Sequence, residues 1–159
     1  MSLEKATFGA GCFWGVEAAF AAIAGVVATA VGYEGGQLDR PSYQDVCTDR
    51  TGHAEVVELD FDPDKVSYDQ LLDAFFNLHD PTTLNHQGPD WGTQYRSVIF
   101  AHSPEQERQA SAKIAELTAE GRFKPKRIVT AVEPAHTFWR AEDYHQRYLE
   151  KRGQTSCHI

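Results

Sequence analysis

The chain has no excess of basic residues and few cysteines. Its 159 residues include 15 Lys and Arg against 23 Asp and Glu, which gives a formal net charge of −8. This charge argues against nonspecific electrostatic binding to nucleic acid or to an anionic membrane. Hydrophobic residues make up 42% and charged residues 24% of the chain. These are the proportions of a globular protein, so a disordered or fibrous chain is excluded.

The chain also lacks a long hydrophobic run. Its longest stretch of small and apolar residues, Ala18–Gly32, is rich in Ala and interrupted by Gly25, whereas a membrane helix needs about 20 predominantly apolar residues. The first residues, Met1–Lys5, do not have the basic-then-apolar layout of a signal peptide. We therefore expect a cytoplasmic protein whose thiols stay reduced.

The three cysteines are Cys12, Cys47 and Cys157, an odd number without CxxC spacing. This pattern argues against a structural disulfide framework and leaves open a reactive thiol. The histidines form no HxxxH pair, and no Cys or His is spaced like a zinc ligand. We therefore expect neither a metal nor another cofactor.

The length fits one domain, and the sequence contains neither an internal repeat nor a linker. We expect a domain over residues 1–151 and a mobile C-terminal tail at 152–159. Apolar and alternating stretches predict strands at 5–10, 26–33, 54–61, 95–101 and 127–133. Helical spacing and capping residues predict helices at 13–22, about 68–78, 104–120 and 141–151. Segments 34–53 and 79–93 are predicted as long loops, and the whole as a mixed sheet with packed helices.

Cys12 is the first candidate for chemistry. It comes directly after a predicted strand and at the start of a predicted helix, where unpaired N–H groups and the helix dipole stabilise a thiolate. Such a position can lower the pKa of a thiol from about 8.5 to 7 or below. A packed thiol beside the core aromatics Phe13 and Trp14 is equally compatible with position alone.

A dinucleotide-binding fingerprint competes for the same segment. Gly9 and Gly11 follow a strand and open a helix, and Glu34 lies near the place of a ribose-binding acid. The third glycine of that motif would have to be residue 14, which is Trp14, and Gly15 comes one position late. An indole there would block the close approach of helix and strand, so the fingerprint remains only a weak alternative.

Several short motifs follow one another in a fixed order along nearly the whole chain. They are Gly11–Gly15 with Glu17, Tyr43–Cys47, Thr51–Glu55, Gln87–Asp90 with Gln94–Ser97, and Ala141–Gln146. Each motif alone is weak, but the ordered set closely resembles the type A peptide methionine sulfoxide reductases. This resemblance implies an α+β fold, a single-domain sandwich whose mixed β-sheet and packed helices contain a ferredoxin-like βαββαβ core.

In that family a cysteine attacks the sulfur of methionine sulfoxide, releases methionine and becomes a sulfenic acid. A second cysteine then forms a disulfide, which thioredoxin reduces. The resemblance implies that this chain is a peptide-methionine (S)-S-oxide reductase that repairs free or protein-bound methionine sulfoxide. It implies thioredoxin as the reductant and no cofactor, and we expect a monomer that binds neither nucleic acid nor membrane.

The resemblance also implies roles for individual residues. It makes Cys12 the nucleophile, Glu55 the carboxylic acid, Tyr43 and Tyr95 the oxygen-binding tyrosines, and Asp90 a pocket acid. The substrate-binding residues that it implies are Phe13, Trp14, His145 and Tyr148. From residue type alone, either tyrosine is more often structural, and Asp90 could merely fix its loop.

The alternation of residues 54–61 independently supports Glu55. Glu55 shares its face of the predicted strand with Val57, Leu59 and Phe61, whereas Glu58 lies on the more polar face. A carboxyl group on an apolar face is desolvated, which raises its pKa and can keep it protonated near neutral pH. Such an acid can activate a sulfoxide oxygen, although a capping role at the strand's start is equally compatible with the position.

Cys157 is our expected resolving cysteine, because a thiol in a polar tail can swing into an active-site cleft. Cys47 lies in a predicted loop beside Val46 and is as compatible with a buried small hydrophobe. Two other classes compete with the reductase, namely a nucleotide-binding oxidoreductase and a non-catalytic peptide-binding module.

Overall fold

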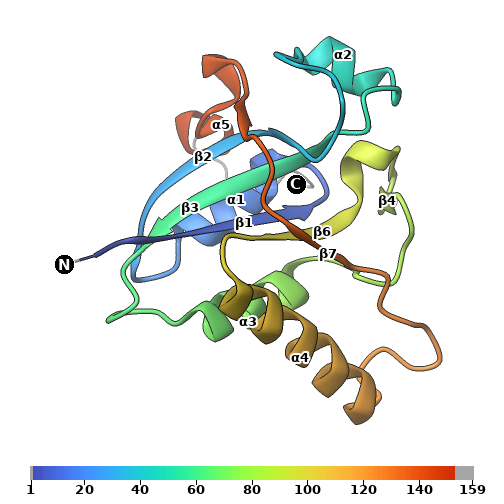
Figure 1. The fold of residues 1–159 in the computed structure, drawn as a ribbon. Coiled ribbons are helices and arrows are strands. Elements are labelled where there is room, and N and C mark those ends of the chain that lie inside the picture. The colour runs from blue at the N-terminus through green and yellow to red at the C-terminus, as the bar shows by residue number, and fades with distance from the viewer. Residues whose placement is uncertain (1, 153–159) are drawn as a thin grey trace.

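A mixed sheet of six strands forms the centre of the structure. The computed structural model describes residues 2–152. The strands are β1 (Glu4–Ala10), β2 (Val26–Glu34), β3 (Ala54–Phe61), β6 (Ser97–Ala101), β7 (Ala131–Pro134) and β8 (Trp139–Arg140). They lie in the order β7-β6-β1-β3-β2-β8 (Figure 1). The pair β6–β7 is parallel, and the other neighbouring pairs are antiparallel.

The four central strands, in the order β6-β1-β3-β2, confirm the predicted βαββαβ core. Helix α1 (Phe13–Ala21) connects β1 to β2, and α3 (Tyr68–Leu78) lies in the connection from β3 to β6. The first and third strands of this unit therefore lie at the middle of the sheet. The start of α1, which follows the end of β1, is held close to the sheet's centre.

The larger hydrophobic core lies between one face of the sheet and the helices α1, α3 and α4 (Pro104–Glu120). Phe8 on β1 stacks on Phe20 of α1 at a centroid distance of 5.0 Å and on Phe75 of α3 at 5.2 Å. All three side chains are fully buried. Since burial of such a side chain contributes about 1.5–3 kcal/mol, this cluster fixes α1 firmly against β1.

A smaller cluster covers part of the opposite face of the sheet. Val56 and Phe100 are buried there, and Phe138 packs against them. Figure 1 shows the orange-red segment that carries Phe138 running across the sheet from β7 toward α5 (Tyr148–Lys151). A Cβ at Gly32 would lie 2.5 Å from the carbonyl oxygen of Trp139, so glycine is required for this close approach.

The predicted helix starts at Ser67 and Ser103 are confirmed. The Ser67 hydroxyl accepts from the Gln70 backbone N–H at 3.0 Å, and the Gln70 side chain accepts from the Ser67 N–H at 2.9 Å. This is the predicted capping box of α3. In α4 the Ser103 hydroxyl accepts from the Gln106 N–H at 3.1 Å. Both helices therefore begin where their side chains satisfy the first free N–H groups.

The two predicted long loops contain short elements that the sequence did not predict. Segment 34–53 includes helix α2 (Tyr43–Cys47), which is capped by Ser42 and Asp45. Segment 79–93 includes the hairpin of β4 (His86–Gln87) and β5 (Asp90–Trp91), followed by the 3₁₀ helix η1 (Thr93–Tyr95). These elements are too short to show a hydrophobic period, which explains why they were missed.

The predicted C-terminal helix over 141–151 is wrong as one continuous element. The segment is divided into the 3₁₀ helix η2 (Asp143–His145) and α5. Arg147 separates them in a left-handed conformation with φ of 52°. The predicted strand at 127–133 starts only at Ala131, and β8 was not predicted. Contacts with β2 and α1, described below, outweigh the local helical preference here.

The topology removes the weak dinucleotide-binding alternative. That motif requires β1 and β2 to be adjacent parallel strands, but β3 lies between them and is antiparallel to both. Glu34 is also buried, and its carboxylate accepts a hydrogen bond from the backbone N–H of His136 at 2.9 Å. Glu34 is therefore part of the fold rather than a ribose-binding acid.

Candidate active site

Cys12 lies in the turn between β1 and α1, where the sequence places it. Gly11 has a φ of 99°, and a Cβ there would lie 3.0 Å from the side chain of Gln87 on β4. Glycine thus allows β1 to turn into α1 directly against the β4–β5 hairpin. Cys12 is the N-cap residue of α1, and its side chain is half-buried. It therefore lies beside the unpaired N–H groups and positive dipole end of a helix.

Glu55 connects β3 to the same turn. Its carboxyl oxygen Oε1 accepts a hydrogen bond from the Phe13 backbone N–H, at an N-to-O distance of 3.2 Å. The Glu55 side chain is 1% exposed, and Val57 and Leu59, on the same face of β3, belong to the main core. The predicted alternation of this strand is thus confirmed. A buried carboxyl group is bonded to the residue that directly follows Cys12.

Tyr95 and Asp90 come from the hairpin and the 3₁₀ helix that follows it. Gln87, which lies against Gly11, pairs with Asp90 across the hairpin. Burial raises the pKa of Tyr95 above its usual range, and it is raised further by the negative charges of Glu55, Asp90, Cys47 and Cys12. The charges that act on Tyr95 include those of the predicted acid, the pocket acid and the nucleophile, so these residues form one group around it. The raised pKa keeps the Tyr95 hydroxyl protonated and able to donate.

Tyr43 reaches the same group from the first residue of α2. Burial raises the pKa of Tyr43, and its contact with the Cys47 thiol and the charge of Glu55 raise it further. Its hydroxyl is therefore also a donor at neutral pH. The two predicted oxygen-binding tyrosines come from segments about fifty residues apart in sequence (43 and 95), and both lie within the electrostatic influence of Glu55.

Glu142 holds Tyr43 in place, a role that the sequence did not indicate. Its carboxylate accepts from the Tyr43 backbone N–H at 3.0 Å and from the Tyr33 hydroxyl at 3.0 Å. Burial raises the pKa of Glu142, but these hydrogen bonds, one from its own backbone N–H and the charge of His145 together lower it below its usual value. Glu142 is thus an ionised link between β2 and the start of α2. Its place in the motif Ala141–Gln146 was the only signal for it.

The four predicted substrate-binding residues form an aromatic cluster beside Cys12, and the Tyr43 ring packs against one of them, His145. Trp14 stacks on Tyr148 at a centroid distance of 3.9 Å and an interplanar angle of 10°. The His145 ring lies 5.2 Å from Phe13, 5.6 Å from Trp14 and 4.7 Å from Tyr43. The structure thus brings together all four predicted substrate-binding residues. They give the start of α1 an apolar wall.

Trp14 fixes the protonation state of His145. The indole N–H donates to His145 Nδ1 at 3.0 Å, so Nδ1 carries no proton and the neutral ring has its proton on Nε2. Burial lowers the pKa of His145, which favours this neutral form. Among the described residues, Nε2 has no hydrogen-bond partner, and it is buried. His145 therefore presents a buried N–H donor within the aromatic cluster.

The structure decides between the two alternatives that the sequence left open for Cys47. The Cys47 side chain is exposed, because α2 turns Val46 and not Cys47 toward the core. Desolvation raises the pKa of the Cys47 thiol, although its contact with Tyr43 lowers it. Cys47 is therefore not a buried small hydrophobe, and it lies next to Tyr43. Cys157 lies outside the described residues.

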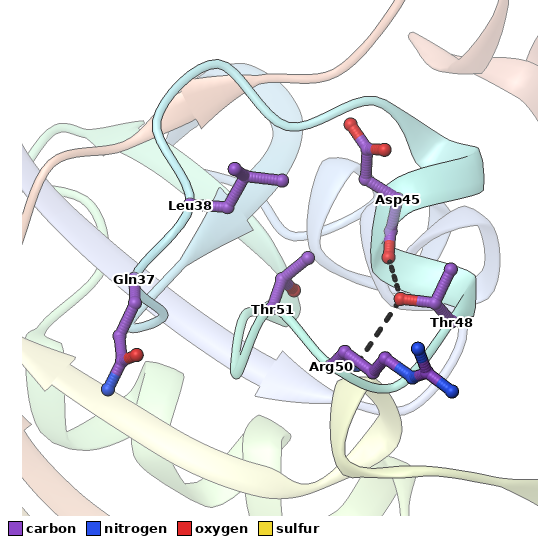
Figure 2. Close-up of a pocket in the computed structure, with 6 residues that line it drawn as sticks. All are labelled: Gln37, Leu38, Asp45, Thr48, Arg50 and Thr51. Carbon is purple, nitrogen blue, oxygen red and sulfur yellow. Dashed lines mark hydrogen bonds between the residues drawn. The ribbon is translucent and has the colours of Figure 1, made fainter.

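A pocket of about 330 Å³ lies between the loop at 37–38, helix α2 and the turn that follows it (Figure 2), and none of the predicted site residues within 2–152 lines it. It is lined by Gln37, Leu38, Asp45, Thr48, Arg50 and Thr51. The Thr48 hydroxyl donates to the Asp45 carbonyl oxygen at 2.6 Å and accepts from the Arg50 N–H at 3.3 Å. These bonds stabilise the turn after α2, and we assign the pocket no part in the chemistry.

Residues 2–152 contain neither a metal-binding cluster of side chains nor a membrane-spanning helix. Within that range, no group of three His, Cys, Asp or Glu side chains is arranged to hold a metal ion. None of the helices in the same range has the length and apolar character needed to cross a membrane.

Comparison with known proteins gives one family over almost the whole chain. Residues 4–159 match the family model described as peptide methionine sulfoxide reductase. The chain is 71% identical to peptide methionine sulfoxide reductase MsrA of Acidobacterium capsulatum, over 99% of this chain and 100% of that protein. It is 64% identical to the protein of the same name from Methanothermobacter thermautotrophicus, over 98% of this chain and 92% of the relative.

Solved structures agree with the sequence comparison. Mxr1 from Saccharomyces cerevisiae in reduced form matches with a TM-score of 0.88 at 39% identity, over 96% of this chain and 87% of that one. Methionine sulfoxide reductase A of Corynebacterium diphtheriae matches with a TM-score of 0.85 at 38% identity, over 98% and 78%. Mxr1 in complex with Trx2 matches with a TM-score of 0.64 at 26% identity, over 92% and 84%. The chain therefore belongs to the peptide methionine sulfoxide reductase family.

Proposed function

We propose that the chain reduces the S epimer of methionine sulfoxide, free or within proteins, with Cys12 as the nucleophile. The observation that carries this proposal is the hydrogen bond from the Phe13 N–H to the buried Glu55 carboxyl group. Because of this bond, the candidate proton donor Glu55 lies next to the residue that follows the Cys12 thiol at the start of α1. The names and structures of the relatives support the same reaction.

The first step uses the thiolate of Cys12. Its sulfur attacks the sulfoxide sulfur, the S–O bond breaks, and the oxygen ends on Cys12 as a sulfenic acid. Overall, a thiol and a sulfoxide give a sulfenic acid and a thioether, so the sulfoxide is reduced by two electrons and Cys12 is oxidised by two. This step needs no further reductant.

Glu55, Tyr43 and Tyr95 act on the sulfoxide oxygen. A sulfoxide is a poor electrophile until its oxygen is protonated or strongly hydrogen-bonded. Burial of a carboxyl group disfavours its charged form, and we propose that Glu55, which is 1% exposed, donates to the oxygen as the protonated acid. The raised pKa values of both tyrosines keep their hydroxyls as donors to the developing negative charge. Asp90, whose charge contributes to the raised pKa of Tyr95, serves as the pocket acid.

The aromatic cluster gives the substrate its orientation. The methyl group of the sulfoxide would lie against Phe13 and Trp14, with His145 and Tyr148 completing the wall. A sulfoxide sulfur carries an oxygen, a methyl group and the rest of the side chain in a fixed handedness. Separate binding places for the oxygen and the methyl group therefore select one epimer.

Recycling requires a second thiol and an external reductant. We propose that Cys157 attacks the sulfenic sulfur, releases water and forms a disulfide with Cys12. Thioredoxin then reduces this disulfide by thiol–disulfide exchange, which regenerates both thiols. The structure of the related Mxr1 in complex with Trx2 supports this choice of reductant.

The direct test is an activity assay on each epimer with dithiothreitol as the reductant. We expect methionine to form from the S epimer and not from the R epimer. A non-catalytic peptide-binding module would form no methionine from either epimer. Equal rates on both epimers would contradict the proposed separation of oxygen and methyl sites.

Removing Cys157 is expected to spare the first turnover and to abolish thioredoxin-supported cycling. One equivalent of methionine per enzyme should still form, because the chemistry at Cys12 is unchanged. Dithiothreitol should restore part of the activity by reducing the sulfenic acid directly. The measurements are methionine release after one turnover and steady-state turnover with thioredoxin.

Cys47→Ser is the matched control for Cys157→Ser, since it also removes a single thiol. We expect it to leave thioredoxin-supported turnover almost unchanged. The exposure of Cys47 and its contact with Tyr43 make this comparison informative. A Cys12–Cys47 disulfide in the wild type, together with normal cycling of Cys157→Ser, would show that Cys47 is the resolving residue.

A further inference from the structure

The position of Trp14 depends on a C-terminal segment that belongs to no strand of the sheet. Tyr148 stacks on one side of the indole, and His145 accepts its N–H. Both partners come from a segment of two very short helices, which are joined by Gln146 and by Arg147 in the left-handed conformation. Since a non-glycine residue in that conformation is strained, other contacts must hold this turn.

The packing of α5 against α1 is incomplete. A pocket of about 390 Å³ opens between the two helices, and Trp14, Leu149 and Arg147 are among its lining residues. The Gln146 side chain anchors the segment on one side, since it accepts from the Val31 N–H at 2.8 Å and donates to the Val31 carbonyl at 2.9 Å. Both bonds lie before the strained turn, so they do not hold the start of α5 directly.

Glu17 makes a second connection. It lies three residues after Trp14, about one turn along α1, and is 2% exposed. Its Oε1 accepts from the Arg147 backbone N–H at 2.7 Å, and its Oε2 accepts from the Thr29 hydroxyl on β2 at 2.8 Å. The carboxylate thus ties α1, β2 and the left-handed turn together at one point.

The environment of Glu17 lacks the charge partner expected for a buried acid. Within residues 2–152, no lysine, arginine or histidine forms an ion pair with it, and the Arg147 side chain instead lies 3.6 Å from Glu150. A buried carboxylate is costly unless hydrogen bonds compensate it. An apolar residue would fill the same space at less cost, so the two hydrogen bonds are what Glu17 adds.

We infer that Glu17 is a positioning residue: it fixes the Arg147 turn and thereby sets the Tyr148–Trp14 stack that forms one wall of the substrate site. This inference rests on the proposed function, because it takes Trp14 and Tyr148 as the wall for the substrate methyl group. Glu17 touches neither the substrate nor Cys12 in this role. Its effect reaches the site through the backbone of the residue before Tyr148.

Glu17→Leu removes both acceptors and is expected to raise KM for methionine S-sulfoxide about fivefold to tenfold, with kcat changed little. This is the size of effect that losing one aromatic stacking partner produces, and a KM effect alone marks lost binding rather than lost chemistry. Glu17→Gln should restore KM, because its carbonyl can accept from the Arg147 N–H while its amide donates to Thr29. Glu17→Asp, a milder change with a shorter reach, replaces Glu17→Leu if that variant does not fold.

Thr29→Val is the matched control. It removes the bond from β2 to Glu17 but leaves the bond to Arg147, so KM should stay at the wild-type value. In a Tyr148→Ala background, Glu17→Leu should have no further effect on KM, because the wall that it positions is already gone. An equal KM increase in Thr29→Val, or a full additional increase in the Tyr148→Ala background, would overturn the inference.

Trp14 fluorescence provides a readout that needs no activity. In a background of Trp91→Phe and Trp139→Phe, Glu17→Leu should change Trp14 emission, because the indole loses its stacked partner, and Thr29→Val should not. Unchanged Trp14 emission in a folded Glu17→Leu variant would overturn the positioning role. If the wild type does not reduce methionine sulfoxide, the proposed function fails, while this emission still decides the role of Glu17.

Discussion

Cys12→Ser is expected to lower methionine formation by at least about 10⁴-fold, the largest effect of any single substitution. A serine hydroxyl does not ionise near neutral pH and cannot take the sulfoxide oxygen as a stable acid, so the first step has no substitute nucleophile. The measurement is methionine released from the S epimer with dithiothreitol, at enzyme concentrations high enough to detect a single turnover.

Cys47→Ser serves as the control for the loss of a thiol near the same site. It should retain activity with dithiothreitol, because Cys47 lies on α2 and not at the start of α1. Activity in Cys12→Ser above about one hundredth of the wild-type value would contradict a nucleophilic role for Cys12. It would favour instead the packed thiol that position alone also allowed.

Glu55→Gln is expected to slow the chemical step by about 10²–10⁴-fold, the usual range for general acid catalysis. The amide can still accept from the Phe13 N–H and can still offer a hydrogen bond, but it cannot deliver a proton. The loss should therefore appear in the rate of sulfenic acid formation in a single turnover and much less in substrate binding.

Glu58→Gln is the matched control, because it makes the same change on the opposite face of the same strand. Glu58 is partly buried next to Lys5, with a side-chain oxygen 3.2 Å from the lysine nitrogen. Its substitution should leave sulfenic acid formation unchanged. If Glu55→Gln forms sulfenic acid as fast as the wild type, the Glu55–Phe13 bond serves only to hold the turn.

Local patterns predicted the parts of the fold that carry a long regular signal. The alternation in β3 put Glu55 on the core face, and the residues Ser67 and Ser103 marked the starts of α3 and α4. Helix α2 has only five residues, and each strand of the β4–β5 hairpin has two. Such elements form because their neighbours hold them, and no periodicity in the sequence can reveal them.

The broken C-terminal helix shows where tertiary contacts outweigh local preference. Residues 141–151 contain neither glycine nor proline, so local rules predict a continuous helix. In the structure the Gln146 side chain binds β2, and the Arg147 N–H binds Glu17, which is 130 positions earlier. Partners so far apart in sequence cannot be identified from spacing.

The site was predicted in part. The turn at Cys12 and the burial of Glu55 followed from the residues themselves, whereas the grouping of Tyr43, Tyr95 and Asp90 depended on the family resemblance. Glu142 was missed as a support for Tyr43, because its carboxylate acts between two segments that only the fold brings together. Cys47 was expected to be as compatible with burial as with exposure, and its exposure emerged only from the orientation of α2.

The most direct measurement follows the oxygen atom onto Cys12 in one turnover. A Cys47→Ser, Cys157→Ser variant is mixed with methionine S-sulfoxide without reductant, trapped with a sulfenic acid reagent, and mapped by mass spectrometry. We expect one equivalent of methionine per enzyme and the trapped sulfenic acid on the peptide that contains Cys12. Methionine formation that leaves Cys12 as an unmodified thiol would contradict its role as the nucleophile.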